Sequence, residues 1–248
     1  MPASPMPLPV SVIVDPEISS HALDNVIWSA LTSQHGPIAQ GDDRARRYPS
    51  QIGPFAAMPD TSPASFAALA QLLTPEDQVA LFTVNEPILP EQFEVLYRKN
   101  LDQMVGPTIP GAVDMAHITQ LGAADVDDMK ALVELAQPGP FGTRTHELGR
   151  YLGVRVNGQL AAMAGERMHL DGYTEISAVC AHPAYRGRGY PRDLIVALSN
   201  AVLARGELPF LHVLSANETA IALYKKLGFS RRCAIQLTVL RRARQDVA

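Results

Sequence analysis

The amino-acid sequence predicts an α/β protein whose mixed, largely antiparallel sheet is flanked by helices. Residues 148–156 alternate between apolar and polar side chains, and the segment 148–181 is interrupted at Asn157-Gly158 and Asp171-Gly172, dipeptides that favour tight hairpin turns. A loop rich in Gly and Arg, residues 182–191, then joins an apolar run to a segment with helical spacing. A second apolar run and a second helical segment follow over 208–227. An antiparallel meander followed by a strand–helix–strand unit makes a mixed sheet.

The composition is that of a globular chain able to bury a core. Hydrophobic residues make up 47% of the 248 residues and charged residues 19%, with a formal net charge of −4. This charge argues against wholesale nucleic-acid binding, which requires a basic excess. No apolar run approaches the ~20 residues that span a bilayer, and residues 1–10 lack the Lys or Arg of a signal peptide. We therefore expect a cytoplasmic protein with no nucleic-acid or membrane partner.

The two cysteines, Cys180 and Cys233, match no metal-binding or redox spacing. Each lies in a strand-like run, so we expect both to pack in the core. The seven histidines show no metal-ligand spacing either. The sequence therefore predicts no metal site.

The first 105 residues mix short strands and helices with many turn signals. Ser62-Pro63 marks a helix start, because Pro is favoured at an early helical position. The Pro and Gly residues of 106–111 are typical of a linker. We therefore expect an N-terminal α/β companion domain over 1–105, a linker over 106–112 and a second domain over 113–248. In the first domain the patterns predict strands at 10–14 and 79–84 and helices at 23–31, 62–73 and 90–98.

The second domain has clearer patterns. Acidic residues in the first turn of the helix expected at 125–135 favour the helix dipole. After the Gly-rich loop, Leu194, Ile195, Leu198 and Val202 fall on one face of a helix. The other expected elements are strands at 113–118, 148–156, 159–169, 173–181, 208–214 and 233–240 and a helix at 217–227.

The loop from His182 to Pro191 has the properties of a phosphate site. A strand runs into it and a helix leaves it, so main-chain N–H groups and the positive end of the helix dipole meet at one place. The expected contacts are the main-chain N–H groups of the loop and the side chains of Arg186 or Arg188. The pattern is neither a Walker A loop nor Gly-x-Gly-x-x-Gly. The alternative is an ordinary strand-to-helix turn with solvated arginines.

A second motif, Asn217-Glu-Thr-Ala-Ile-Ala-Leu-Tyr224-Lys-Lys-Leu-Gly-Phe229, follows the strand expected at 208–214. Asn217 is a good helix cap, and Gly228 is typical of a helix C-terminus.

These two motifs together resemble the GNAT superfamily of acyl-CoA-dependent N-acyltransferases. The family's pyrophosphate motif, Arg/Gln-x-x-Gly-x-Gly/Ala, is matched by Arg186, Gly189 and Pro191. The second family motif, an Asn followed by Leu-Tyr-x-x-Leu-Gly-Phe, is matched by Asn217 and residues 223–229. The resemblance covers residues 113–242 and looks closest to the two-part branch with the acyltransferase at the C-terminus, as in glycine N-acyltransferases. It implies a GNAT-type sheet.

The resemblance also implies how acetyl-CoA, or another acyl-CoA, binds as co-substrate. The pantetheine arm lies along the strand at 173–181 and contacts main-chain groups of Val179 and Ala181. Its phosphates contact the loop at Gly187, Arg188, Gly189 and Tyr190. Pro191 departs from the family Gly or Ala and removes one N–H donor, although Pro suits a first helical turn.

For catalysis, the resemblance makes Tyr224 the acid that protonates the departing thiolate, since a phenol pKa near 10 suits that transfer. Asn217 either contacts the pantetheine arm or only caps its helix. Glu175 is the first candidate for the general base, because it lies four residues before Val179 and period-two alternation places both side chains on one face. Glu166, His182 or a chain of waters are the alternatives. Residues 141–145 occupy the position of an acceptor-lining loop.

The function expected from these features is transfer of an acyl group, with acetyl the first choice, to a small-molecule primary amine by direct attack. A catalytically silent acyl-CoA sensor and an interaction scaffold are the alternatives. Retention of Tyr224 favours the enzyme. The sequence leaves open the acceptor, the acyl chain length and the formation of a homo-oligomer.

Overall fold

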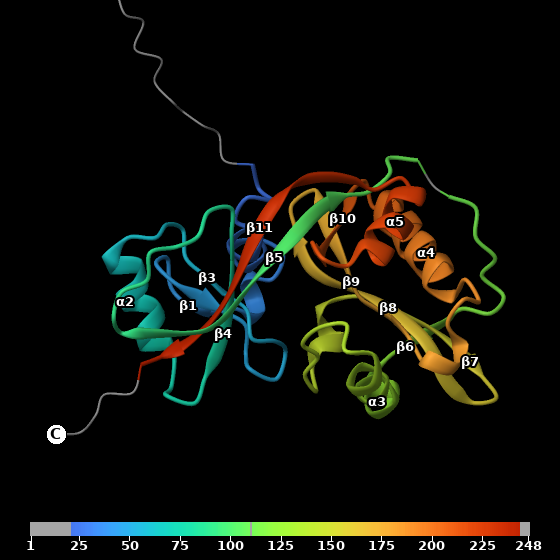
Figure 1. The fold of residues 1–248 in the computed structure, drawn as a ribbon, viewed down its shortest axis with the longest axis horizontal. Helices are drawn as coiled ribbons and strands as arrows, with labels where there is room; N and C mark the ends of the chain where they lie inside the picture. Colours follow the sequence, from blue (N-terminus) through green and yellow to red (C-terminus); the bar gives the residue numbers. More distant parts are fainter. Residues whose placement is uncertain (1–20, 110, 244–248) are drawn as a thin grey trace, which may run out of the picture.

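The computed structural model describes residues 21–109 and 111–243, which form two sheets and five α-helices (Figure 1). The larger sheet has eight strands in the order β4-β11-β5-β10-β9-β8-β7-β6, and the smaller one has three in the order β1-β2-β3. Within the described part of the large sheet only β9 and β10 pair in parallel. The mixed, largely antiparallel α/β class is therefore confirmed.

The α-helices are α1 (Val26–Thr32), α2 (Pro63–Leu72), α3 (Val126–Ala136), α4 (Tyr190–Ala204) and α5 (Glu218–Lys226). The strands are β1 (Gln40–Gly41), β2 (Arg46–Arg47), β3 (Ala56–Ala57), β4 (Gln78–Thr83), β5 (Phe93–Val105), β6 (Thr119–Leu121), β7 (Tyr151–Val156), β8 (Gln159–Leu170), β9 (Tyr173–Ala181), β10 (Leu208–Leu214) and β11 (Ser230–Arg242). Short 3-10 turns occur at Gly36–Ile38, Ala123–Asp125, Thr145–Leu148 and Pro183–Tyr185.

The meander β7–β8–β9 follows the expected hairpins. Asn157 and Gly158 have φ values of 50° and 82°, and Gly172 has a φ of 78°. These left-handed conformations are the ones that tight hairpin turns need and that Asn and Gly tolerate. The expected elements at 62–73, 79–84, 125–135, 208–214 and 217–227 are confirmed within a few residues at each end.

Two expected elements are wrong, and one lies outside the described residues. Residues 90–98 are not a helix: most of them belong to the strand β5, which pairs with β11 along most of its length. Their Phe-x-Val-x-Tyr alternation suits a strand, and long-range pairing overrides the helix-like start at Pro90. Residues 113–118 form no strand, since Asp114 accepts a hydrogen bond from the Ala116 N–H and turns the chain. The strand expected at 10–14 lies outside the described residues.

The long ribbon of β5 and β11 joins β4, at one end of the large sheet, to the strands β10 to β6 (Figure 1). β11 lies between β4 and β5, and β5 also pairs with β10. The large sheet thus takes strands from both sides of residues 106–112. The division into domains at that segment stays a prediction.

Helices cover both faces of the sheet around β7–β10. On one face, which we call the α3 face, Met129 and Leu132 of α3 pack on Tyr151, Met163 and Cys180. The opposite face, which we call the α4 face, carries α4 and α5 and the cluster built around Leu194, Leu198 and Tyr224. Figure 1 shows these helices on opposite sides of the strands.

Two strand–helix–strand units repeat in the chain. In the second, β9 leads through α4 to the parallel strand β10. In the first, the segment entering β3 leads through α2 to β4, with a parallel bridge between Phe55 and Ala80. No helix among the described residues has the length and apolar character to cross a bilayer.

Candidate active site

The parallel strands β9 and β10 separate along their length and leave a wedge between them. They pair only where Tyr173, Thr174 and Glu175 face residues 208–210. Beyond that point, residues 176–181 of β9 have no pairing with β10. Parallel strands that part at their carboxyl ends leave main-chain groups free on the facing edges, so an extended ligand can add to β9 as an extra strand. Val179 and Ala181 lie in this part of β9.

A β-bulge lies inside the wedge. The pairing of β8 with β9 shifts between Met163–Cys180 and Gly165–Ser177, so one β8 residue faces both Ala178 and Val179. Ala178 has a φ of 53°, a left-handed conformation that is unusual for a residue with a Cβ. Bulges occur next to active sites because they turn peptide groups out of the ladder. A peptide turned in this way can polarise a carbonyl placed in the wedge.

The Gly-rich loop lies at the carboxyl end of β9 and opens α4. Gly187 and Gly189 have φ values of 76° and 84°, and no side chain caps the α4 N-terminus. Residues 186–189 are all exposed. The guanidinium of Arg188 lies 5.3 Å from the Tyr185 ring centre. An uncapped helix N-terminus with two exposed arginines has the properties that favour an anion. The phosphate site expected from the sequence stays a prediction. Pro191 falls in the first turn of α4.

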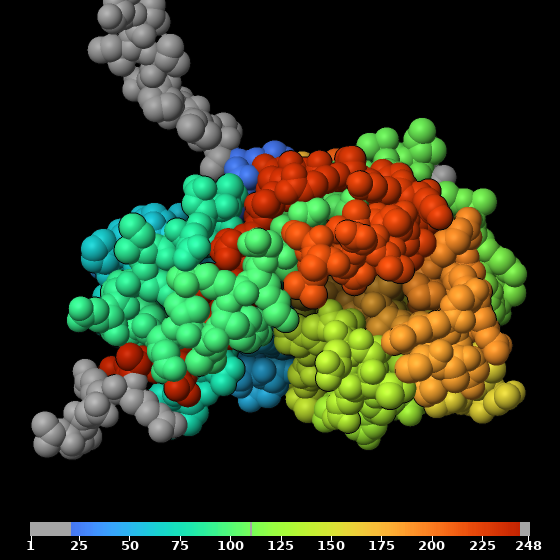
Figure 2. Space-filling model, viewed as in Figure 1, coloured from blue at the N-terminus to red at the C-terminus, as the bar shows by residue number. Residues whose placement is uncertain are grey.

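Tyr224 of α5 lies on the α4 face of the wedge. Burial raises the pKa of Tyr224 to about 12, so the phenol is neutral at ordinary pH. Within the described residues no group hydrogen-bonds its hydroxyl, which leaves the proton available to a ligand. Figure 2 shows a hollow between the red-orange segment that carries α5 and the yellow-green segment that carries α3.

Asn217 caps α5, since its Oδ1 accepts a hydrogen bond from the Ala220 N–H at 3.1 Å. The capping role left open by the sequence is therefore present. This bond occupies the side chain in the absence of a ligand.

Glu175 is part of a buried ion-pair network on the α3 face. Its carboxylate is 0% exposed and accepts hydrogen bonds of 2.7 and 2.6 Å from Nε and Nη2 of Arg167. The Nδ1 of His212 lies 2.8 Å from the same carboxylate. Burial alone would raise the pKa of Glu175, but the charge and hydrogen bonds of Arg167, with the hydrogen bond of His212, lower it to about 2. A carboxylate held in this way is a weak base.

The bulge also separates Glu175 from Val179. Simple alternation places the two side chains on one face, and this expectation is wrong. The extra residue at Ala178 changes the alternation, so Val179 packs with Ile176 on the α4 face while Glu175 pairs with Arg167 on the other. A bulge cannot be read from apolar alternation, because the pattern carries no sign of an inserted residue.

The two other candidate bases have structural partners. Glu166 is 6% exposed; its Oε1 lies 3.0 Å from Arg205, and its Oε2 accepts the Arg150 N–H. The Nδ1 of His182 accepts the Ala184 N–H and caps the short turn before the loop. The carboxylate and the imidazole therefore each hold part of the fold in place.

Three residues of this region are missed by sequence reasoning: Tyr151, Arg167 and His212. Arg167 and His212 are polar residues inside largely apolar strands, which is the one signal the sequence offers. Which face each occupies depends on a second bulge, where Arg167 and Met168 together face Glu175. The sequence does not reveal that register.

The expected acceptor loop lies on the α3 face. Phe141 packs edge-on against Tyr151, with ring centres 5.7 Å apart. Arg144 instead pairs with Glu147 at the surface. Thr145 bonds to Gly142 and to the main chain of Ile52, so it fixes the loop and does not offer a free hydroxyl.

The described residues contain no group of His, Cys, Asp or Glu side chains suited to a metal ion. Cys180 is buried, and burial raises the pKa of its thiol to about 12. Such a thiol remains protonated and is a poor nucleophile.

Other proteins resemble this chain in sequence and fold. A family model described as FR47-like protein matches residues 151–237. A crystal structure from Novosphingobium aromaticivorans, assigned to the acetyltransferases of the GNAT family, is 36% identical, with a TM-score of 0.85 over 91% of this chain and 100% of that one. A GCN5-related N-acetyltransferase from Kribbella flavida shares the fold alone, with 15% identity and a TM-score of 0.58 over 91% of this chain and 98% of that one.

Two curated relatives match parts of the chain. An uncharacterised protein of Mycobacterium leprae is 30% identical over 74% of this chain and 46% of its own length. The N-alpha-acetyltransferase RimI of Mycobacterium tuberculosis is 38% identical over 33% of this chain and 52% of its own length. The chain thus spans about half the length of each of these relatives.

Proposed function

This chain belongs to the GNAT acetyltransferase family, and on that premise we propose that it moves an acetyl group from acetyl-CoA to a primary amine by direct attack. The observation that carries the proposal is the bulge at Ala178, which lies inside the wedge and is followed by the exposed Gly-rich loop. The wedge suits a pantetheine arm, the bulge suits a thioester carbonyl and the loop suits a diphosphate.

In the proposed complex the pantetheine arm runs along the free edge of β9 at Val179 and Ala181. The diphosphate takes N–H groups of Gly187, Arg188, Gly189 and Tyr190, and Arg186 or Arg188 pairs with it. Pro191 supplies no N–H, so the site has one donor fewer than a Gly or Ala there would give.

The reaction uses both faces of the sheet. The neutral amine approaches from the α3 face, and its nitrogen attacks the thioester carbon while a main-chain N–H at the bulge stabilises the developing oxyanion. The carbon–sulfur bond then breaks, and the sulfur takes a proton from the Tyr224 hydroxyl on the α4 face. The amine nitrogen loses a proton to water, and the Tyr224 oxygen regains a proton from water. The products are an N-acetyl amine and free CoA.

We propose water as the immediate proton acceptor because Glu175 is fully engaged. Both of its oxygens accept hydrogen bonds from Arg167, and one also contacts His212. Glu175 then acts by holding Arg167 and His212 in position. A pH–rate profile that is unchanged in Glu175→Gln supports this role, whereas a flattened profile makes Glu175 the base.

The test of the proposed function follows thiol release from acetyl-CoA with a panel of amino acids, polyamines and aminoglycosides. We expect free thiol in equal amount to an acetylated amine detected by mass spectrometry. Binding of CoA by calorimetry without acetylation of any amine would instead indicate an acyl-CoA sensor. Longer acyl-CoAs in the same assay measure the acyl chain length.

We also propose the two-part branch and a cytoplasmic location. Support for the branch comes from the repeated strand–helix–strand topology of β3–α2–β4 and β9–α4–β10. The α-amino group acted on by an N-alpha-acetyltransferase such as the relative RimI is one example of the primary amine proposed here.

A further inference from the structure

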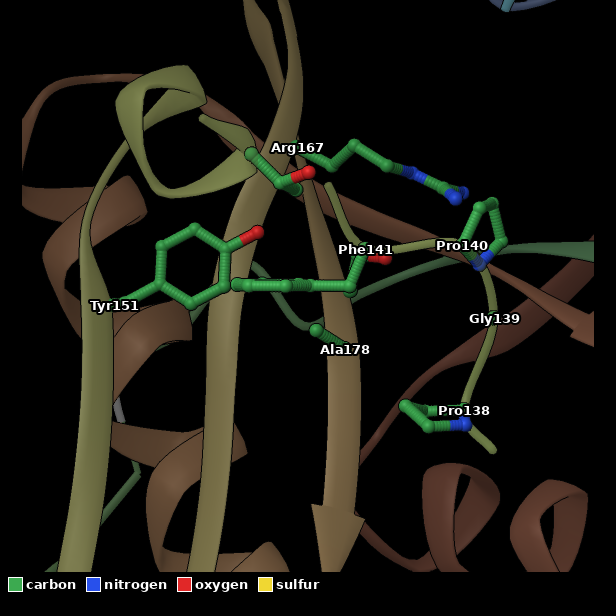
Figure 3. A pocket seen from close by; sticks show the side chains of 9 residues that line it. Pro138, Gly139, Pro140, Phe141, Tyr151, Arg167 and Ala178 are labelled. Atoms are coloured by element: carbon green, nitrogen blue, oxygen red, sulfur yellow. The ribbon is translucent and has the colours of Figure 1, made fainter. Parts of the chain in front are cut away.

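A small pocket lies on the α3 face beside the bulge (Figure 3). Its volume of about 10 Å³ holds one water-sized group. Because Ala178 is one of its walls, the pocket adjoins the proposed position of the thioester on the side from which the amine approaches. The lining residues are Pro138, Gly139, Pro140, Phe141, Thr145, Tyr151, Arg167, Ser177 and Ala178.

Tyr151 brings a buried hydroxyl to this pocket with no partner. The residue is 1% exposed, and its Oη has no hydrogen bond to any described residue. Burial raises the pKa of Tyr151, so the phenol is neutral and can donate. A buried hydroxyl without a partner destabilises a fold, so a ligand that accepts its proton would remove that cost.

The chain makes room for this tyrosine. Gly165 of β8 faces Tyr151 of β7, and a Cβ on Gly165 would lie 2.2 Å from the ring. The ring therefore lies across β8 only because residue 165 is glycine. The position of the hydroxyl is fixed by packing and not by a bond of its own.

Arg167 brings a second free donor. Its Nε and Nη2 bond to Glu175, and its guanidinium lies 4.8 Å from the Phe55 ring centre. Within the described part of the chain no group accepts a hydrogen bond from its Nη1. The ion pair and the ring thus orient the guanidinium and leave one edge of it unused. Figure 3 shows Arg167 and the Tyr151 hydroxyl on the same side of Phe141.

We infer that Tyr151 and Arg167 bind a carboxylate oxygen of the acceptor, which makes the acceptor an amino acid. The inference rests on the proposed function and names its substrate class. Tyr151 and the free edge of Arg167 both donate, so they satisfy a group that only accepts, and a carboxylate is such a group. An amine in the same place leaves its own N–H groups without partners. A carboxylate oxygen makes stronger, charge-assisted hydrogen bonds to these donors than the oxygen of a neutral amide.

The size of the pocket limits how the acceptor binds. One oxygen enters between Tyr151 and Arg167, and the rest of the molecule extends past Ala178 toward the wedge. The amine must reach the thioester from there, so it lies only a few bonds from the carboxylate. α-Amino acids and short amino acids such as β-alanine meet this requirement.

The test compares matched acceptors: alanine, alaninamide and ethylamine. With acetyl-CoA, we expect kcat/KM for alanine to exceed that for alaninamide at least 10-fold, measured by thiol release. Tyr151→Phe removes only the hydroxyl and should lower kcat/KM for alanine about 10-fold through KM, the scale of one hydrogen bond. The values for alaninamide should change less than 2-fold.

Arg167→Lys is the second variant because it keeps a charge beside Glu175 and removes Nη1. It should reproduce the loss for alanine. Tyr48→Phe is the matched control, since Tyr48 is also 1% exposed but its hydroxyl bonds to His35. The control should leave the preference for alanine unchanged.

The outcomes separate this inference from the proposed function. Acetylation of amines with equal kcat/KM for alanine and alaninamide, or a preference unaltered in Tyr151→Phe, overturns the carboxylate subsite and leaves the acetyltransferase in place. A higher kcat/KM for a peptide amine than for free alanine also overturns it. Failure to bind CoA and to acetylate any amine overturns both.

Discussion

The two strand–helix–strand units share one topology and differ in the loop that starts the helix. In each unit the two parallel strands pair over only a few residues, and the helix lies between them in the sequence. The loop before α4 has two glycines with positive φ and no capping side chain. Before α2, the Asp60 carboxylate accepts hydrogen bonds from the Ser62 N–H and the Ser65 hydroxyl, and Ser62 caps the helix.

On the proposed function, this difference means that topology supplies the space and the loop decides the ligand. The parting of β3 and β4 leaves a groove of about 580 Å³ with Asp24, Asp60 and Glu86 in its lining. Its helix N-terminus already holds a carboxylate of the chain, so a diphosphate there meets negative charge and no free donors. Before α4 the same position is open and positively charged.

The largest expected effect concerns Tyr224 of α5, which has no counterpart in the first unit. Tyr224→Phe should lower turnover roughly 10²–10⁴-fold, because it removes the proposed proton donor to the thiolate. Stopped-flow and steady-state thiol assays measure the chemical step. CoA affinity should stay the same, and Tyr185→Phe in the loop region serves as control. Wild-type turnover with chemistry rate-limiting would leave Tyr224 a packing residue.

A second prediction concerns the ion-pair network beside the second unit. The pKa of Glu175 lies near 2 in the folded protein, below its unfolded value of 4.5. Its ionisation therefore stabilises the fold above pH 4.5, and that contribution of about 3 kcal/mol is lost as the pH falls toward 2. Urea unfolding at stepped pH should show this fall in the wild type.

Glu175→Gln sharpens the same test. The variant should lose about 3–5 kcal/mol near neutral pH, because Arg167 is left buried without a counter-charge. Its stability should then change less between pH 4.5 and 2 than that of the wild type. If the free energy of unfolding depends on pH equally in the wild type and the variant, the loss of stability at low pH does not come from Glu175.

The proposed anion site is tested by charge reversal. Arg186→Glu should weaken CoA binding by about 2 kcal/mol, roughly 30-fold, since a charge-assisted contact is replaced by repulsion. Calorimetry with CoA measures it. Arg44→Glu is the control, an exposed arginine near the first unit. If Arg186→Glu and Arg44→Glu weaken CoA binding equally, only the overall charge of the protein affects CoA affinity.

The smallest effect compares the two prolines. Pro191 and Pro63 both lie in the first turn of their helices. Pro191→Gly restores an N–H at the anion site and should tighten CoA by up to about 1 kcal/mol, less the cost of a more flexible loop. Pro63→Gly should leave CoA affinity unchanged. A large loss in Pro191→Gly would show that the proline organises the loop.

Local signals predicted most of the second half of the chain. The Asn157-Gly158 turn and the capping by Asn217 depend on neighbouring residues, and the structure has them where expected. The strand β5 was missed because its partner β11 lies more than a hundred residues away. The loop and Tyr224 stand out in sequence, whereas Arg167 and His212 do not, because two bulges decide which face each strand residue occupies.

The place of β11 has a consequence for how the chain acquires its structure. β4 and β5 are close in sequence, yet β11 separates them in the sheet, so neither has its full set of main-chain bonds until residues 230–242 arrive. During synthesis, β4 and β5 keep unpaired strand edges while more than a hundred further residues are added. Such long-range pairing slows folding and exposes strand edges to aggregation. We expect folding to finish only when the last strand inserts, so the rate of that insertion sets how long the nascent chain depends on chaperones.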